Sequence, residues 1–128
     1  MIDLKTVINI HNILIEKFGG SKGIRDIAGL EAALARPYAT FEQMDLYPTA
    51  QEKAVATFES IITNHPFIDG NKRTAFVLMR LILMNSGIDL AGPQDEKYKM
   101  VISASKGEMG FDEIKKWVIG RSIRKHAP

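Results

Sequence analysis

Ten consecutive residues near the middle of the chain carry side chains that could do chemistry together: Asn64-His65-Pro66-Phe67-Ile68-Asp69-Gly70-Asn71-Lys72-Arg73. A histidine titrates near neutral pH and can take a proton from an attacking hydroxyl. A carboxylate such as that of Asp69 can hold a hard cation such as Mg²⁺. Asp69-Gly70 is also a turn signal that leads directly into an apolar helical pattern, which predicts a helix start over residues 70–73.

A helix start at this place predicts a phosphate site. The first N–H groups of a helix lack internal partners, and the helix dipole places roughly half a positive charge there. Lys72 and Arg73 add two cations where cations are normally disfavoured, an arrangement that suits a bound anion. Arg73 can hold two phosphate oxygens at once, and Gly70 lets the backbone approach a ligand closely.

The segment from His65 to Arg73 resembles the signature of the Fic/Doc family, in its death-on-curing (Doc) branch. Residues 23–26 and 30–37 resemble the N-terminal part of the same branch. The resemblance implies a compact Fic-like helical bundle that uses ATP and Mg²⁺. It makes His65 the catalytic base and Asp69 the metal ligand. It assigns nucleotide phosphate binding to Gly70, Asn71, Lys72 and Arg73.

Each of these side chains also has a structural interpretation. His65 could simply hydrogen-bond its loop, and spacing alone does not decide between that role and catalysis. Asp69 could cap the following helix, and Lys72 and Arg73 could form a solvated charged turn. Two further residues are predicted to be structural only. These are Phe67, as an anchor of the loop in the core, and Arg80, with a partner at the helix edge.

The motif departs from that of adenylylating Fic proteins, which usually read HPFxxGNGRxxR. Lys72 stands in place of the second motif glycine, and Phe76 in place of the last arginine. The Doc branch carries the same changes and is associated with an inverted nucleotide whose γ-phosphoryl group faces the attacking hydroxyl. The resemblance therefore implies phosphoryl transfer to a Ser/Thr hydroxyl of an elongation factor Tu-like translation factor, ahead of adenylyl transfer. A non-catalytic module remains a further alternative, in which Lys22, Arg25, Lys72 and Arg73 bind nucleic acid or an acidic protein.

Length and composition set broad limits. A chain of 128 residues with 45% hydrophobic residues predicts one domain, residues 1–128, with a real core. There is no cysteine and no basic start followed by an apolar run, so we expect a cytoplasmic protein without a signal peptide. The longest apolar block, residues 75–84, is interrupted by Arg80 and is too short to span a bilayer. A net charge of +2 is a weak bias that permits contact with nucleotides or acidic partners but is not by itself the signature of a nucleic-acid-binding protein, and nucleic acid is not the expected partner.

Helical periodicity organises the longest apolar segments. It predicts helices over 4–18, 30–35, 50–64, 74–85 and 94–105, and a last helix that contains residues 111–118. His11 falls on the apolar face of the first helix, where a hydrogen-bonded core histidine is favoured over a catalytic one. No segment shows useful strand alternation. The fold class is therefore all-α, a bundle around a central buried helix, residues 74–85.

Two further expectations concern partners. Residues 38–48 have no helical period and predict a loop or short hairpin, which in Fic-like folds is a flap that holds a target segment. Many Fic proteins carry an inhibitory helix with a glutamate four residues after a Ser or Thr, and no such pair exists in this chain. Restraint should therefore come in trans. Doc-like proteins are toxins paired with a small antitoxin whose disordered tail folds on binding, so the resemblance implies a toxin of a type II toxin-antitoxin system with such a partner. The face around His11 and the flap are the predicted docking groove.

Overall fold

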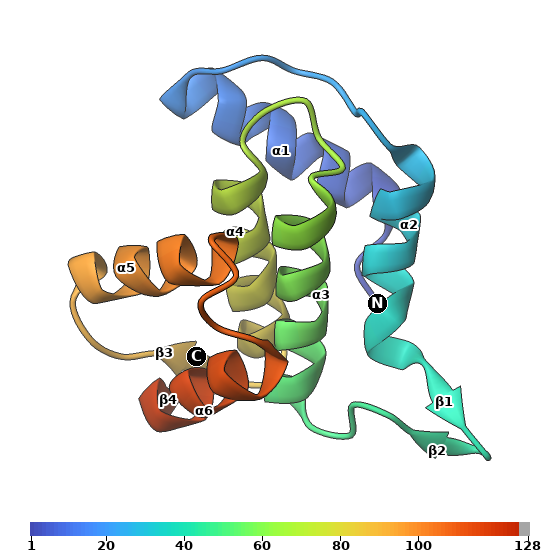
Figure 1. Cartoon of the computed structure of the whole chain (residues 1–128), viewed down its shortest axis with the longest axis vertical. Coiled ribbons are helices and arrows are strands. Elements are labelled where there is room, and N and C mark those ends of the chain that lie inside the picture. Colours follow the sequence, from blue (N-terminus) through green and yellow to red (C-terminus); the bar gives the residue numbers. More distant parts are fainter. Residues whose placement is uncertain (126–128) are drawn as a thin grey trace.

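Two neighbouring helices, α3 (Ala50–Asn64) and α4 (Asn71–Met84), stand at the centre of the structure (Figure 1). The computed structural model describes residues 1–125. Four more helices surround the central pair: α1 (Leu4–Phe18), α2 (Ile27–Ala35), α5 (Gln94–Ser105) and α6 (Phe111–Arg121). Helices α2 and α6 pack on α3, α1 packs on α4, and α5 touches both. The expected all-α bundle is confirmed.

Side-chain caps explain where the first three helices begin. Asp3 accepts a hydrogen bond from the Thr6 N–H, Asp26 from the Gly29 N–H, and Thr49 from the Glu52 N–H. Each such cap is worth about 1 kcal/mol. Helix α2 consequently starts three residues before the predicted position, directly after its Asp26 cap. The predicted bounds of the helices over 4–18, 50–64 and 94–105 are those observed.

Helix α4 is central but is not enclosed on all sides. Thr74, Leu78 and Met79 face the core, whereas Val77 is only partly buried and Met84 is 52% exposed. Helix α3 contributes more buried residues than α4 does. The sequence of α4 is apolar nearly all round because its second apolar side lines an open groove rather than a neighbouring helix.

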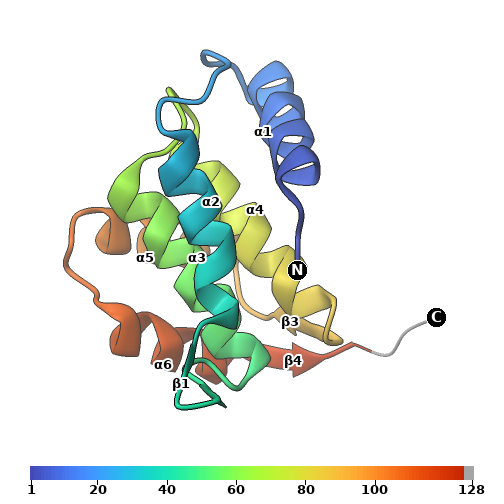
Figure 2. The ribbon, with the colours of Figure 1, turned by 90° about the vertical axis from the view of Figure 1, so that its right-hand side faces the viewer.

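A hairpin forms in the segment where one was predicted. Strands β1 (Thr40–Phe41) and β2 (Met44–Asp45) pair antiparallel, and the turn residues Glu42 and Gln43 both have positive φ, as a two-residue primed turn requires. Both views place the hairpin beyond the N-terminal end of α3, whereas the motif loop follows its C-terminal end (Figures 1 and 2). The 15 residues of α3 span about 22 Å. This placement does not support a flap beside His65.

A second pair of short strands lies outside this segment, although the sequence shows no useful strand alternation there. Strands β3 (Ile88–Leu90) and β4 (Ser122–Arg124) form a second antiparallel pair. All three residues of β3 are buried, so the strand lacks the alternation of buried and exposed positions by which strands are recognised.

Arg80 has the structural partner that the sequence predicted. Its Nε and Nη2 donate to the two carboxylate oxygens of Asp89 at 2.9 and 3.0 Å, and the Leu90 N–H also donates to Asp89. The Asp89 side chain is only 7% exposed. The Arg80 hydrogen bonds hold the pKa of Asp89 at about 2, well below its usual value. This ion pair joins α4 to β3.

Replacing Arg80 with methionine should therefore destabilise the protein by about 3 kcal/mol, because a buried carboxylate loses its main partner. The pKa of Asp89 is lower in the folded state than in the unfolded state. Its charge thus contributes stability above about pH 4, and that contribution is lost as the pH falls through about 2. The difference in unfolding free energy between wild type and Arg80→Met, measured by urea denaturation, should shrink over the same range. A double variant, Arg80→Met with Asp89→Leu, should recover stability. A difference that stays constant with pH would contradict this account.

Candidate active site

His65 ends α3 in an unusual backbone conformation. Its φ of 49° and ψ of 59° lie in the left-handed region, which non-glycine residues rarely adopt. A segment far away in the sequence holds this turn in place. The Arg25 side chain donates to the backbone carbonyl groups of Asn64 and His65, and the backbone N–H groups of Arg25 and Asp26 both donate to the carbonyl of Pro66. A strained residue that is fixed from outside in this way is typical of a functional position.

The His65 side chain itself is free. It is exposed and forms no hydrogen bond within residues 1–125. The Arg25 side chain bonds the backbone carbonyl of His65 and not the ring. The structural interpretation, in which the imidazole ties the loop together, finds no contact to support it. The ring lines a groove and is available to a ligand there.

Helix α4 begins next to this histidine without a protein cap. Gly70 precedes the helix with a φ of 74°, no side chain bonds the first N–H groups, and the first turn has no acidic residue. Lys72 and Arg73 are exposed in that turn. The positive φ favours glycine at position 70, and a Cβ there would also lie close to Ile15, 3.0 Å from its Cδ1. An uncapped helix start with two cations is a ready site for phosphate.

Asp69 does not cap α4, although a capping role was one alternative. Its Oδ1 accepts from the Gly70 N–H at 2.8 Å, and its Oδ2 accepts from the Ser21 N–H at 3.1 Å. The side chain is exposed, and its oxygens retain further lone pairs. Within residues 1–125 no group of three or more His, Cys, Asp or Glu side chains could hold a metal. Any cation at Asp69 would need its other ligands from a bound phosphate and from water. Mg²⁺ in proteins is usually coordinated by such a set of ligands.

The Asn71 side chain performs a task that the sequence did not reveal. Its Oδ1 accepts from the Phe67 N–H, and its Nδ2 donates to the Phe67 carbonyl, both at 2.9 Å. This pair of bonds fixes the loop across four residues. A role of Asn71 in placing phosphate oxygens stays a prediction, and it would use the backbone N–H or the second amide hydrogen.

Phe67 and His11 anchor the loop in the core, as predicted. Both side chains are 1% exposed, and their rings stack with centroids 3.9 Å apart and planes 6° apart. The His11 Nε2 lies 2.7 Å from the carbonyl oxygen of Asp69. His11 is therefore a hydrogen-bonded core histidine.

The four cations of the alternative basic module do not form one open surface. Lys22 pairs with Glu16 at 2.5 Å, and Arg25 is occupied by backbone carbonyl groups. The Arg73 guanidinium lies 4.2 Å from the centroid of the Phe18 ring, and Lys72 has no ion pair within residues 1–125. Two cations remain for a ligand, both at the start of α4, and this favours a small anion over a long nucleic acid.

The motif residues share one groove of about 860 Å³ between α1, α4 and α5. Its lining includes seven motif residues, namely Ile68 and the six predicted site residues His65, Asp69, Gly70, Asn71, Lys72 and Arg73. The remainder is mainly apolar and includes Ile10, Leu14, Phe76, Leu81 and Val101. The structure thus brings together all of the site residues that the sequence predicted.

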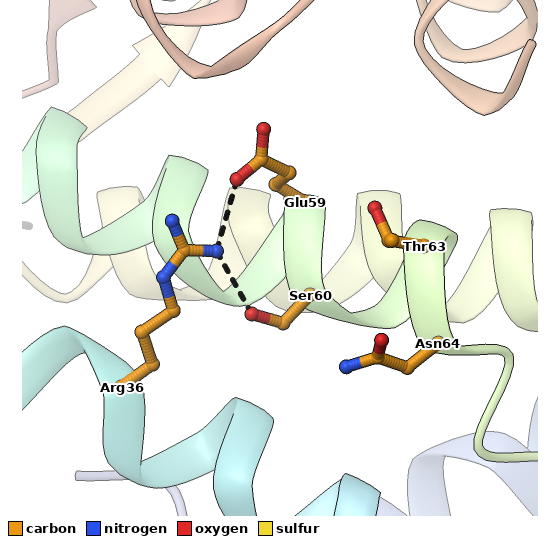
Figure 3. A pocket seen from close by; sticks show the side chains of 5 residues that line it. All are labelled: Arg36, Glu59, Ser60, Thr63 and Asn64. Atoms are coloured by element: carbon orange, nitrogen blue, oxygen red, sulfur yellow. Dashed lines mark hydrogen bonds and ion pairs between the residues drawn. The ribbon is translucent and has the colours of Figure 1, made fainter. Parts of the chain in front are cut away.

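A second, smaller cavity of about 340 Å³ lies against the opposite face of α3 from α4, where Arg36 of the short 3₁₀ helix η1 (Arg36–Tyr38) enters it (Figure 3). Arg36 Nη1 lies 3.0 Å from both Glu59 Oε1 and Ser60 Oγ, and its Nε donates to the Tyr47 hydroxyl. Glu59 neutralises the guanidinium, so this cavity lacks the free positive charge of the first groove. Arg36 instead ties the base of the hairpin to α3.

Comparison with known proteins agrees with this geometry. A model of the Fic/DOC family matches residues 1–83, which extend from the N-terminus almost to the end of α4. The chain belongs to the Fic/Doc family. It is 44% identical over 78 residues to "Toxin Doc" of Mycolicibacterium smegmatis (strain ATCC 700084 / mc(2)155), a match that covers 61% of this chain and 60% of that protein. It is 28% identical over 116 residues to "Protein kinase doc" of Escherichia phage P1, which covers 88% of each.

Both relatives place this Fic/Doc protein in the Doc branch, which confirms the resemblance drawn from the motif. The family match ends at residue 83, so α5, α6 and the β3–β4 pair lie beyond it. Residues 1–125 contain no helix with the length and apolar character needed to cross a membrane.

Proposed function

We propose that this Fic/Doc protein is a toxin that transfers the γ-phosphoryl group of ATP to a Ser/Thr hydroxyl of an elongation factor Tu-like translation factor. One observation carries the proposal: a free histidine, an exposed carboxylate and an uncapped, cationic helix start all line the same groove. The names of the two relatives, "Toxin Doc" and "Protein kinase doc", support the toxic effect and the reaction respectively.

The residues present fit ATP and Mg²⁺. Asp69 offers a single carboxylate, and Mg²⁺ typically binds one or two carboxylates together with nucleotide phosphates and water. When bound, Mg²⁺ supplies charge neutralisation at the phosphates. Lys72, Arg73 and the free N–H groups of α4 would bind the remaining phosphate oxygens.

In this proposal His65 takes the proton of the target hydroxyl. The hydroxyl oxygen forms a bond to the γ-phosphorus, the bond from that phosphorus to the bridging oxygen breaks, and ADP leaves with the bonding electron pair. Because the imidazole has no competing hydrogen bond within residues 1–125, it is free to accept this proton. The Arg25 side chain holds His65 in place through its backbone carbonyl, so the ring is not used for this contact.

Phosphoryl transfer ranks ahead of adenylyl transfer because of two positions. Lys72 brings bulk and charge where adenylylating Fic proteins have glycine, and it is exposed in the groove. Phe76 lines the same groove where those proteins have their second arginine. The phosphate arrangement that adenylyl transfer needs would therefore lack both its space and one of its ligands.

For the proposed antitoxin we retain one part of the docking surface predicted from sequence, the α1 face around His11. His11 itself is buried, but Ile10 and Leu14 of the same helix line the open groove, whereas the hairpin lies at the far end of α3 from His65. The open groove between α1, α4 and α5 offers apolar walls, with Lys72, Arg73 and Lys97 among its lining residues. An amphipathic antitoxin segment with acidic side chains complements this surface, and it would cover His65 while bound.

Expression of the unmodified protein alone should arrest bacterial growth, and co-expression of the product of a short neighbouring reading frame should relieve the arrest. The physical reason is that the proposed antitoxin occupies the groove that holds the catalytic base. Growth curves and a pull-down of the two products would measure both effects. The matched control is His65→Ala, which should bind the same antitoxin but leave growth unaffected. Normal growth at high levels of the unmodified protein would contradict the toxin proposal.

A further inference from the structure

We propose that His11 is a positioning residue for Asp69, and that it acts together with the loop that follows α1. This inference rests on the proposed function, because it concerns where the metal carboxylate stands. The relevant contact joins residues 58 positions apart: His11 Nε2 and the carbonyl oxygen of Asp69, at 2.7 Å. A carbonyl oxygen only accepts hydrogen bonds, so Nε2 carries the hydrogen and donates it.

Asp69 is held at three of its oxygen atoms. His11 holds the backbone carbonyl, the Ser21 N–H holds Oδ2, and the Gly70 N–H holds Oδ1. These donors come from α1, from the loop after α1 and from the start of α4. The carboxylate is therefore fixed in direction as well as in place, although it is exposed to the groove.

Gly20 leaves room for the Asp69 carboxylate. A Cβ at Gly20 would lie 2.7 Å from Asp69 Oδ2, whereas a Cβ at Gly70 would make only an ordinary contact of 3.6 Å with His11 Nε2. Gly20 has a φ of 116° and Gly70 a φ of 74°, so both also need the conformational freedom of glycine. The neighbouring Gly19 has a φ of 91° but no atom within 4 Å of its Cβ position.

A purely structural role would not need histidine at position 11. The side chain is 1% exposed on the apolar face of α1, beside the buried Val7 and Ile15, where an aliphatic residue of similar volume would pack. The imidazole adds two features to such packing, namely the stacking on the Phe67 ring and the N–H that reaches Asp69. Only the N–H acts on Asp69. Loss of a group that orients a metal ligand typically lowers metal affinity by about 10–100-fold.

The test compares four full-length proteins: wild type, His11→Leu, His11→Gln and Val7→Ala. Leucine fills the site without a donor, and the amide of glutamine can restore the donor. Val7→Ala creates a cavity in the same helix at a fully buried position. The measurement is a Mg²⁺ titration of the binding of a non-hydrolysable ATP analogue, at a temperature where circular dichroism shows each protein to be folded.

His11→Leu should raise the Mg²⁺ concentration at half-maximal binding by about 10–100-fold, and binding in EDTA should change little. His11→Gln should recover most of the loss, and Val7→Ala should match wild type. The Ser21 amide signal in NMR spectra gives a second readout, since Mg²⁺ and the analogue should shift it in wild type but not in His11→Leu.

Substitution of the glycines provides a second, independent test of the same proposal. Gly20→Ala should weaken Mg²⁺-dependent binding because its methyl group displaces the Asp69 carboxylate, whereas Gly19→Ala carries a similar backbone cost without that displacement. An unchanged Mg²⁺ midpoint in folded His11→Leu, or an equal shift in Val7→Ala, would overturn the positioning role and leave the proposed function standing. A wild type that binds the analogue without any dependence on Mg²⁺ would overturn both.

Discussion

Replacing His65 with alanine should lower the rate of phosphoryl transfer by about 10²–10⁴-fold, which is the usual cost of losing a positioned general base. Nucleotide binding should be nearly unchanged, because the phosphate groups are expected on the start of α4 and not on the imidazole. The fold should also persist, since the Arg25 side chain holds this turn through the backbone carbonyl groups of Asn64 and His65, which the substitution leaves in place. The measurement is single-turnover transfer to the target protein, together with analogue binding.

The left-handed backbone of His65 calls for a control, because alanine adopts this conformation reluctantly. His65→Asn tolerates the left-handed region better but supplies no base, so it should be as inactive as His65→Ala and closer to wild type in stability. Undiminished transfer by either variant would rule out His65 as the base. A loss of transfer only in step with a loss of folded protein would assign His65 a structural role.

Removing the Asp69 carboxylate should have the second largest effect. Loss of a group that only orients a metal ligand typically lowers affinity by roughly 10–100-fold. Asp69→Ala removes the ligand itself, so it should weaken ATP binding in the presence of Mg²⁺ by more than this. In EDTA the same change should matter little, because the phosphates would still meet Lys72, Arg73 and the start of α4. Isothermal titration in the two buffers measures both values.

Thermal unfolding must accompany the Asp69 measurement, since the carboxylate also accepts hydrogen bonds from Ser21 and Gly70. Their loss should cost about 1 kcal/mol each. Asp69→Asn is the matched variant, because it removes the charge but keeps an acceptor oxygen for one of these two bonds. Equal losses of affinity in Mg²⁺ and in EDTA would show that Asp69 acts on the fold and not on a metal.

Local features of the sequence were sufficient for most of the helices and for naming residues that share the groove. The apolar period of 4–18 and 50–64 and the turn at Asp69-Gly70 are each encoded within a few residues, and the structure confirms them. The contacts that hold the motif loop are not local. Arg25 reaches His65 across 40 residues, and His11 reaches Asp69 across 58. No periodicity reveals such pairs, because they depend on how helices already formed pack together.

The errors have equally physical causes. The three residues of β3 are all buried, so they give no strand signal, and their pairing with β4 depends on a segment more than 30 residues away. The hairpin was predicted from its lack of helical period, which does not indicate where the hairpin lies. A hydrogen bond from Arg36 to the Tyr47 hydroxyl closes the base of the hairpin, which lies at the opposite end of α3 from the motif. The apolar surface of α4 was read as burial, whereas part of it lines the groove.

The most direct test of phosphoryl transfer uses ATP labelled either at the γ- or at the α-phosphorus. The purified protein is added with each nucleotide to a bacterial lysate, with His65→Ala as the control, and labelled proteins are identified by mass spectrometry. The γ-label should appear on one translation factor, at a Ser or Thr, and the α-label on none. The α-label on that target would instead show adenylyl transfer, and no label from either nucleotide would contradict the enzyme assignment altogether.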